Sequence, residues 1–140
     1  MTREEIVALF ARRQDALDRH DAAAVASEHD DTCLLESPMV GKVTGRAAIA
    51  KVYESLFTWF PDFVFTSEEL LIDGDCVAQL GTFAGTDTGG FMGLPPTGKP
   101  MRVPGMFLYT LNDRHIVHQR TIYDFTGMLV QNGVLKAKPA

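Results

Sequence analysis

The sequence predicts an α+β fold in which a curved antiparallel sheet wraps around N-terminal helices. Apolar residues recur at helical spacing up to residue 60, and they alternate at strand spacing between residues 63 and 123. The connections between the later strands, such as Asp73-Gly74, are too short for helical crossovers. Neighbouring strands joined in this way must run antiparallel, so we expect the helices to pack on the concave face of one sheet.

The first helix is predicted from a capping pattern. Thr2 is followed three residues later by Glu5, a spacing in which the two side chains satisfy free amides at a helix start. Apolar residues then recur to about Arg19, interrupted by Arg13 within the apolar stripe. Asp21 is placed to cap a second, shorter helix over 22–29.

A short strand and a third helix come next. Residues 33–35 read as a strand that ends before Pro38, and Gly45 opens a helix that Pro61 stops. One face of this helix carries Ile49, Val52, Tyr53, Leu56 and Phe60.

The second half of the chain reads as strands. Four alternating segments are expected, followed by one short C-terminal helix: 63–72, 76–86, 101–111, 115–123 and, for the helix, 125–132. The third strand segment places Val103, Phe107 and Tyr109 on one side.

Composition excludes several classes of protein. The chain has 140 residues, the length of one domain, so we expect a single domain over 1–140. A formal net charge of −5 argues against nucleic-acid binding. No apolar run is long enough for a membrane span, and the N-terminus does not resemble a signal peptide, so we expect a cytoplasmic protein. Cys33 and Cys76 form no metal or disulfide motif, and the four histidines lack metal-ligand spacing.

A long connection lies between two of the predicted strands. Residues 87–100 contain three prolines and several apolar side chains. Loops of this length in small domains are often functional. We expect either a lid or pocket rim, or an extended hairpin that covers a sheet edge or a second subunit.

Four segments together resemble the SnoaL-like polyketide cyclases, which share the nuclear-transport-factor-2 fold. They are GFMGLPPTGKP at 90–100, HIVHQRTIYD at 115–124, GMLVQNG at 127–133 and SPMVGKVTGRAAI at 37–49. Asn132 departs from the family pattern, which commonly has leucine at this place.

The resemblance implies a cone-shaped barrel, nuclear transport factor 2-like, whose mouth holds a small apolar molecule, usually within a homo-oligomer such as a dimer. It also implies an intramolecular aldol ring closure without metal or organic cofactor. One aspartate shuttles the proton in these cyclases, and the matching position here is Asp124.

Asp124 has two interpretations. In an apolar cavity its pKa would rise, and the carboxyl group could accept and return a proton. As the residue before a predicted helix, it could instead be an N-cap. His118 and Arg120 share its strand face if alternation continues to the end of the strand, and they could polarise a substrate carbonyl. Tyr123 would then face the opposite way.

Further candidates surround this predicted pocket. Glu36 could act as an alternative base, although a surface acid is the simpler interpretation. Trp59, Phe91, Met92 and Met106 could bind substrate, or they could belong to the core.

These features favour an acid/base cyclase or isomerase that acts on a small apolar carbonyl compound. The alternative is a non-catalytic small-molecule binding or association module with the same fold. An epoxide hydrolase-like activity ranks last, because it needs two acids around Arg120 and the sequence offers only Asp124 there.

Overall fold

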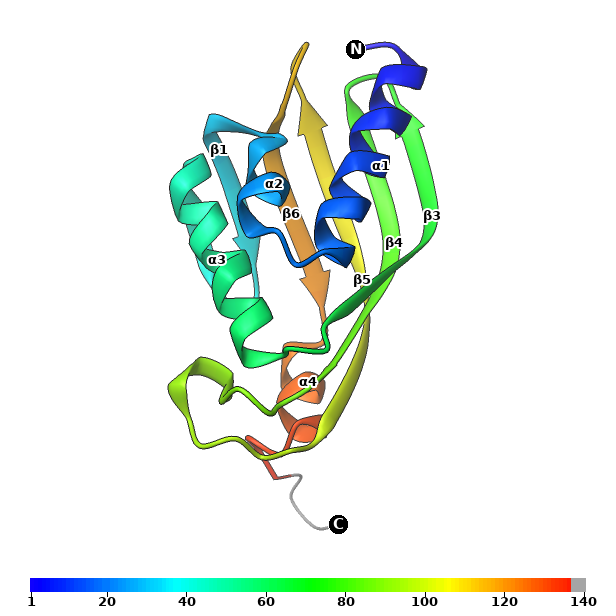
Figure 1. The fold of residues 1–140 in the computed structure, drawn as a ribbon. Coiled ribbons are helices and arrows are strands. Elements are labelled where there is room, and N and C mark those ends of the chain that lie inside the picture. The colour runs from blue at the N-terminus through cyan, green and yellow to red at the C-terminus, as the bar shows by residue number, and fades with distance from the viewer. Residues whose placement is uncertain (137–140) are drawn as a thin grey trace.

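The computed structural model describes residues 1–136 and shows one six-stranded sheet with helices on its inner side (Figure 1). The strands lie in the order β2-β1-β6-β5-β4-β3. The elements in chain order are α1 (Arg3–Asp18), α2 (Ala22–Ser27), β1 (His29–Ser37), β2 (Gly41–Thr44), α3 (Arg46–Trp59), β3 (Val64–Asp73), β4 (Cys76–Thr86), the 3-10 turn η1 (Phe91–Gly93), β5 (Pro100–Leu111), β6 (Ile116–Tyr123) and α4 (Phe125–Gln131).

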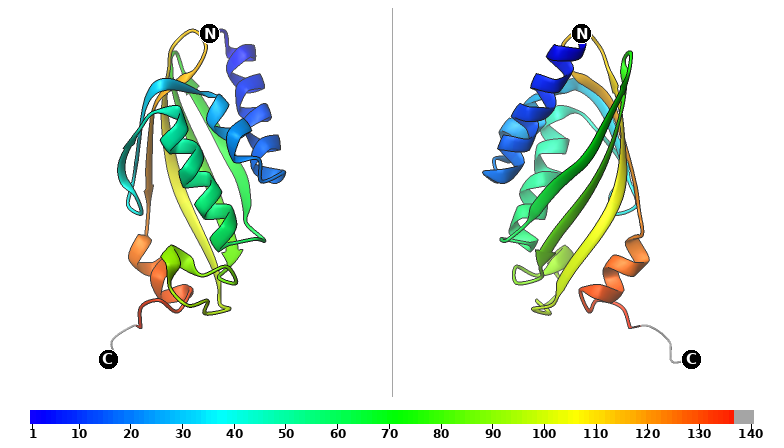
Figure 2. Two further views of the ribbon diagram at one scale, coloured as in Figure 1. Left: turned by 60° about the vertical axis from the view of Figure 1, so that its left-hand side comes forward. Right: turned by 90° about the vertical axis from the view of Figure 1, so that its right-hand side faces the viewer.

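The predicted α+β architecture is confirmed. Figure 2 shows α1, α2 and α3 on the concave side of the curled sheet. Within residues 1–136 the outer strands β2 and β3 do not pair with each other, so the sheet curls without closing.

Local sequence signals explain where the helices begin and end. The Thr2 hydroxyl accepts a hydrogen bond from Glu5 N (3.1 Å), and the Glu5 carboxylate accepts one from Thr2 N (2.7 Å). This is the predicted capping box at the start of α1. The Asp21 carboxylate caps α2 through Ala24 N.

The first strand differs from the prediction. Instead of residues 33–35, β1 covers His29–Ser37 and pairs with β2. It also pairs in parallel with β6, with Leu35 opposite Gln119. Parallel pairing is possible because β1 and β6 are separated by most of the chain, so no short turn constrains their direction.

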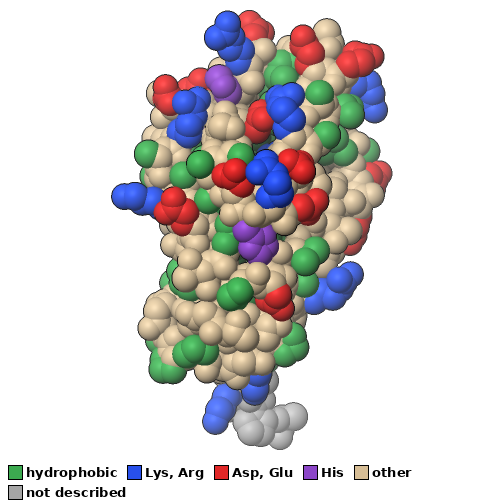
Figure 3. All heavy atoms as spheres, in the orientation of Figure 1, with side chains coloured by type: hydrophobic (Ala, Val, Ile, Leu, Met, Phe, Trp, Pro, Cys, Tyr) green, Lys and Arg blue, Asp and Glu red, His purple; other side chains and the backbone are tan. Residues whose placement is uncertain are grey.

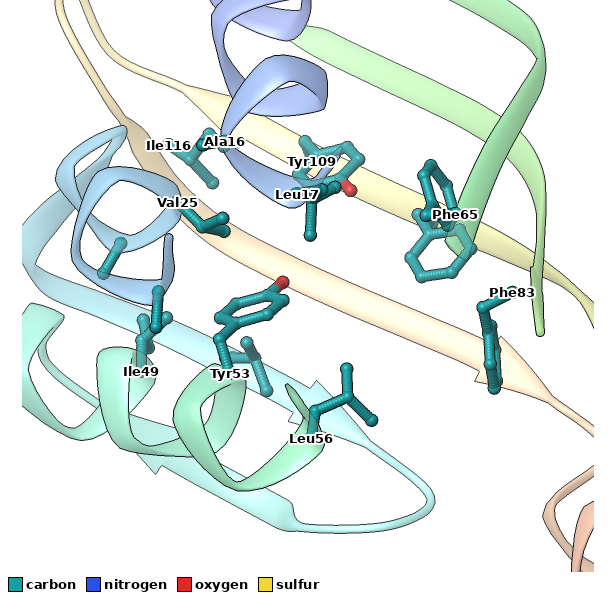
Figure 4. Packing of buried hydrophobic residues seen from close by; sticks show 14 of the residues in the cluster. Ala16, Leu17, Val25, Ile49, Tyr53, Leu56, Phe65, Phe83, Tyr109 and Ile116 are labelled. Carbon is teal, nitrogen blue, oxygen red and sulfur yellow. The ribbon is translucent and has the colours of Figure 1, made fainter. Parts of the chain in front are cut away.

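The core fills the space between α1, α2, α3 and the sheet. Figure 4 shows Ala16, Leu17, Val25, Ile49 and Tyr53 converging from the helices, with further side chains from the strands opposite. Most of these side chains are fully buried, and part of the space between them remains open as a cavity.

Candidate functional site

A cavity of about 80 Å³ lies between α1, α3 and the concave face of the sheet. Its walls are mainly apolar and aromatic, and Figure 4 shows Leu56, Phe65 and Phe83 reaching in from α3, β3 and β4. The lining consists of Arg13, Leu17, Leu35, Ser37, Met39, Val52, Tyr53, Leu56, Phe63, Phe65, Phe83, Phe107, Gln119, Thr121, Tyr123 and Met128. A largely apolar enclosure with a few polar groups is the usual form of a small-molecule site.

The inner wall of the cavity holds a hydrogen-bonded group of three side chains from α1, α3 and β6. Arg13 Nη2 donates to the Tyr53 hydroxyl (2.5 Å) and contacts Gln119 Oε1 (3.4 Å). Gln119 Nε2 donates to the same Tyr53 hydroxyl (3.3 Å). The Tyr53 oxygen therefore accepts two hydrogen bonds, which leaves its own proton available to a ligand.

Arg13 is a buried cation without a carboxylate partner among the described residues. Its side chain is 4% exposed, and its Nε has no hydrogen-bond partner. The guanidinium lies over the rings of Tyr53 and Tyr109, 5.7 and 5.2 Å from their centroids. Cation–π contacts and neutral oxygens offset only part of the cost of desolvating a charge.

His29 lies behind this group and is fully buried. Its Nε2 contacts Gln119 Oε1 (2.7 Å) and its Nδ1 contacts Val25 O (3.2 Å). Burial, followed by the nearby charge of Arg13, lowers the pKa of His29 to about 4. The ring is therefore neutral near pH 7 and holds Gln119 in place without adding charge.

The lining residues that keep some exposure mark the mouth of the cavity. They are Ser37, Met39, Val52 and Tyr123. Burial raises the pKa of Tyr123 to about 12, against the opposite effect of the Ser37 side chain and the Met39 backbone. Tyr123 therefore presents a neutral hydroxyl at the mouth.

Asp124 lies outside the cavity lining, and the expectation that it sits in an apolar chamber is wrong. Its side chain is exposed and accepts a hydrogen bond from Gly127 N (2.9 Å) as the N-cap of α4. The N-cap interpretation of this residue is the one the geometry supports.

His118 and Arg120 also point away from the cavity, contrary to the predicted face. Thr110 pairs with His118 and Leu111 pairs with Ile116, so an extra residue at Val117 forms a bulge. A bulge reverses which residues face inward. Gln119 and Thr121 consequently face the cavity. Tyr123, which was expected to point away from it, also faces the cavity.

Glu36 lies on the outer side of the sheet, where it pairs with His118. The His118 Nε2 to Glu36 Oε2 distance is 2.6 Å. This hydrogen bond from His118 is the largest of the effects that lower the pKa of Glu36. The pair is partly exposed and lies at the surface, and Glu36 is not placed as a base in the cavity.

The four predicted substrate-binding side chains do not line the cavity either. Phe91 is fully buried and packs against Trp59 (5.2 Å between ring centroids), while Met92 (52% exposed) and Met106 (41% exposed) face solvent. The core interpretation therefore holds for Trp59 and Phe91.

The 87–100 loop is an ordered structural unit and not part of the cavity wall. Asp87 is fully buried, and its carboxylate accepts hydrogen bonds from Gly90 N (3.1 Å), Phe91 N (2.9 Å), and Thr97 N (3.3 Å) and Oγ1 (3.1 Å). The single proton of Thr97 Oγ1 is shared between the Asp87 carboxylate and Asn132 O, which ties the loop to the end of α4. Figure 1 shows this loop and α4 together at one end of the molecule, and no residue of the loop is among the lining residues of the cavity.

The hydrogen-bonded side chains of Arg13, Tyr53 and Gln119 were not identified from the sequence as part of the candidate site. A signal existed for Arg13, because a charged residue within the apolar stripe of a helix is directed toward the core. Tyr53 was expected on an apolar helix face, without a role in binding. Gln119 was not predicted to face the cavity, because the bulge at Val117 changes which residues of β6 point inward.

Three structural properties bear on the excluded classes of protein. Within residues 1–136, no helix combines the length and apolar character that crossing a bilayer requires. Figure 3 shows acidic and basic side chains intermixed over the helical face, with no broad basic surface there. Three or more His, Cys, Asp or Glu side chains do not come together as a metal site in the described part of the chain.

Comparison with known proteins identifies the fold. No curated protein matched the chain. Among solved structures, AclR from Streptomyces galilaeus, a candidate hydroxylase, aligns with a TM-score of 0.83 at 24% identity, covering 99% of this chain and 87% of AclR. TsrD from Streptomyces laurentii aligns with a TM-score of 0.84 at 19% identity, covering 96% and 99% of the two chains. IdmH from Streptomyces antibioticus, a candidate polyketide cyclase, aligns with a TM-score of 0.74 at 25% identity, covering 91% and 97%.

A fourth neighbour is named for its ketosteroid isomerase-like fold and comes from Catenulispora acidiphila. The predicted fold family, with the sheet curled and unclosed, is therefore confirmed. The family of SnoaL-like polyketide cyclases matches residues 8–132, which is most of the sequence. The chain belongs to the SnoaL-like polyketide cyclase family.

Proposed function

We propose that the chain is an enzyme of the cyclase or isomerase type that acts on a small carbonyl compound in the cavity. The observation that carries the proposal is the Tyr53 hydroxyl, which accepts hydrogen bonds from Arg13 and Gln119 and keeps its proton for a ligand at an apolar wall. A carbonyl oxygen that receives this proton in a hydrogen bond would be polarised. The developing negative charge of an enolate would be stabilised further by Arg13.

The walls of the cavity support the same chemistry. Phe65, Phe83 and Phe107 are buried and give the cavity that contains Tyr53 mainly apolar walls. Hydrogen bonds and charges act more strongly in such a low-dielectric space than in water. Family membership and the structural likeness to IdmH agree with a role of this kind.

The side chains that line the cavity limit which substrates could lose a proton there. No Asp, Glu or His occurs among the described lining residues. The proposed substrate is therefore a relatively strong carbon acid, such as a compound with a C–H group between two carbonyls, which can lose its proton to water or to a basic group of its own. Asp124 has the structural task of capping α4 in this scheme.

Exchange of the C2 proton of ethyl 2-methylacetoacetate for deuterium, followed by NMR, tests the proposal. The wild-type protein should accelerate exchange over the background. Tyr53→Phe should reduce the acceleration by about a hundredfold or more, the usual effect of removing one such donor. Asp124→Asn is the control and should exchange at the wild-type rate. Full activity of Tyr53→Phe, or loss of activity in Asp124→Asn, would overturn the assignment.

A non-catalytic binding module is the second candidate, and the absence of a base among the described lining residues favours it. It predicts that a carbonyl ligand binds in the cavity without any acceleration of exchange. The epoxide-hydrolase alternative is not proposed, because the described lining offers an arginine but no pair of acids.

We also propose that the chain forms a homodimer through the outer face of the sheet. Exposed apolar side chains from neighbouring strands gather there, and Leu71, Leu108, Met106 and Ile122 are among them. Apolar side chains gathered on one sheet face are typical of an interaction surface.

A further inference from the structure

We propose that the cavity selects an anionic ligand and takes it head first, with carboxylate or enolate oxygens at Arg13 and an apolar body directed to the mouth. This inference rests on the proposed function only in that the cavity is the ligand site. It adds a class of substrate, because the chemistry proposed above would also accept a neutral carbonyl compound.

The charge balance around the cavity is the first argument. Glu28 is an acid close to this part of α1, but its carboxylate is bound by Arg12 through two hydrogen bonds of 2.8 and 3.1 Å. Arg13 forms no ion pair within residues 1–136. The cavity therefore carries a net positive charge that an anionic ligand would neutralise.

The unused hydrogen-bonding capacity of Arg13 is the second argument. The hydrogen bonds of its guanidinium run from Nη2, whereas Nε is buried and has no partner. A guanidinium presents its N–H groups in a planar fork that fits two oxygens of one anion. A buried donor without a partner is costly to the free protein, and a ligand oxygen would remove this cost.

The arrangement of the lining gives the orientation of the ligand. Arg13, Tyr53 and Gln119 form the buried inner wall, while Met39 and Val52 lie at the exposed mouth. The cavity has a volume of about 80 Å³ and is open at its mouth. It can hold an anionic head with the first atoms of an apolar body, and the remainder would extend through the mouth.

Calorimetric titration with benzoate and benzamide at pH 7 tests the inference, because the two probes have nearly the same shape and differ in charge. Wild-type protein should bind benzoate about tenfold to a hundredfold more tightly, the range for a hydrogen bond to a charged group. Arg13→Met should abolish this preference and keep the weak binding of benzamide. Arg102→Met, which removes an exposed arginine of β5 outside the cavity lining, should retain the wild-type preference.

A second arm distinguishes a carboxylate ligand from an enolate. Benzoylacetone is neutral at pH 7 and gains a long-wavelength absorption band as its enolate, so the appearance of this band on addition of wild-type protein reports enolate capture. Either a benzoate preference or an enolate band that is lost in Arg13→Met supports the inference and names the source of the anion.

Two outcomes overturn the inference in different ways. Equal binding of benzoate and benzamide without an enolate band refutes the anion preference and leaves the cavity as a ligand site. Failure of all three probes to bind refutes the ligand site itself. The wild-type comparison decides the matter even if Arg13→Met does not fold, and Arg13→Lys then serves as the variant that keeps the charge but loses the planar fork.

Discussion

The buried carboxylate of Asp87 should hold the 87–100 loop in place, and Asp87→Ala tests how strongly. The carboxylate accepts hydrogen bonds from Gly90 N and Phe91 N, both at buried residues, and from Thr97 at a partly exposed one. Each buried amide left without a partner costs about 1–3 kcal/mol. The amide at Thr97 can turn to water, so the loss of unfolding free energy comes from two groups and should be about 2–6 kcal/mol.

Urea denaturation followed by circular dichroism measures this loss. Asp62→Ala is the matched control, because Asp62 also accepts two hydrogen bonds, from Thr86 N and Oγ1 at 2.7 Å each, but is exposed. Water replaces these bonds in the variant, so its loss should stay within about 1 kcal/mol. Equal stability of the two variants would show that the Asp87 carboxylate does not organise the loop.

Three further outcomes are expected. Because burial lowers the pKa of His29 to about 4, the unfolded chain binds a proton that the folded chain rejects as the pH falls from about 6.5 to 4. Urea denaturation at pH 7 and pH 4 should show His29→Asn losing about 3 kcal/mol less than wild type across this window, and equal losses would contradict the shift. Asp124→Ala should lower the unfolding free energy by about 1 kcal/mol through loss of the α4 cap, and a loss above about 3 kcal/mol would point to a role beyond capping. Ile122→Asp should convert the proposed dimer to monomer in sedimentation velocity, whereas Asp113→Asn in the exposed β5–β6 turn should leave the dimer intact.

The local elements could be predicted from the sequence, because their signals are local. Thr2 and Glu5 mark the start of α1, and Pro61 follows the end of α3. The turn between β3 and β4 is formed by Gly74-Asp75, one residue later than the predicted Asp73-Gly74. Each of these features is determined mainly by the backbone preferences of a few adjacent residues and not by contacts with distant parts of the chain. The α+β class then follows from the change in apolar spacing between the two halves.

The site could not be predicted in the same way, because it depends on pairing between distant segments. Ile116 faces inward, and strict alternation from it would direct His118 and Arg120 inward as well. The bulge at Val117 reverses the alternation, and only the partner strand β5 reveals it. The parallel pairing of β1 and β6 is a long-range property too, with no signature in either strand alone.

The origin of the cavity wall in three remote segments has a consequence for folding. Arg13 and Gln119, which contact each other, are 106 residues apart, and Arg13 and Tyr53 are 40 apart. A ligand that contacts all of these side chains therefore connects the first helix to the last strand. It binds only the folded protein and so stabilises the folded state. Amide hydrogens of β6, an interior strand of the sheet, should exchange with solvent more slowly when the ligand is present, so hydrogen exchange in this strand would report binding in the cavity.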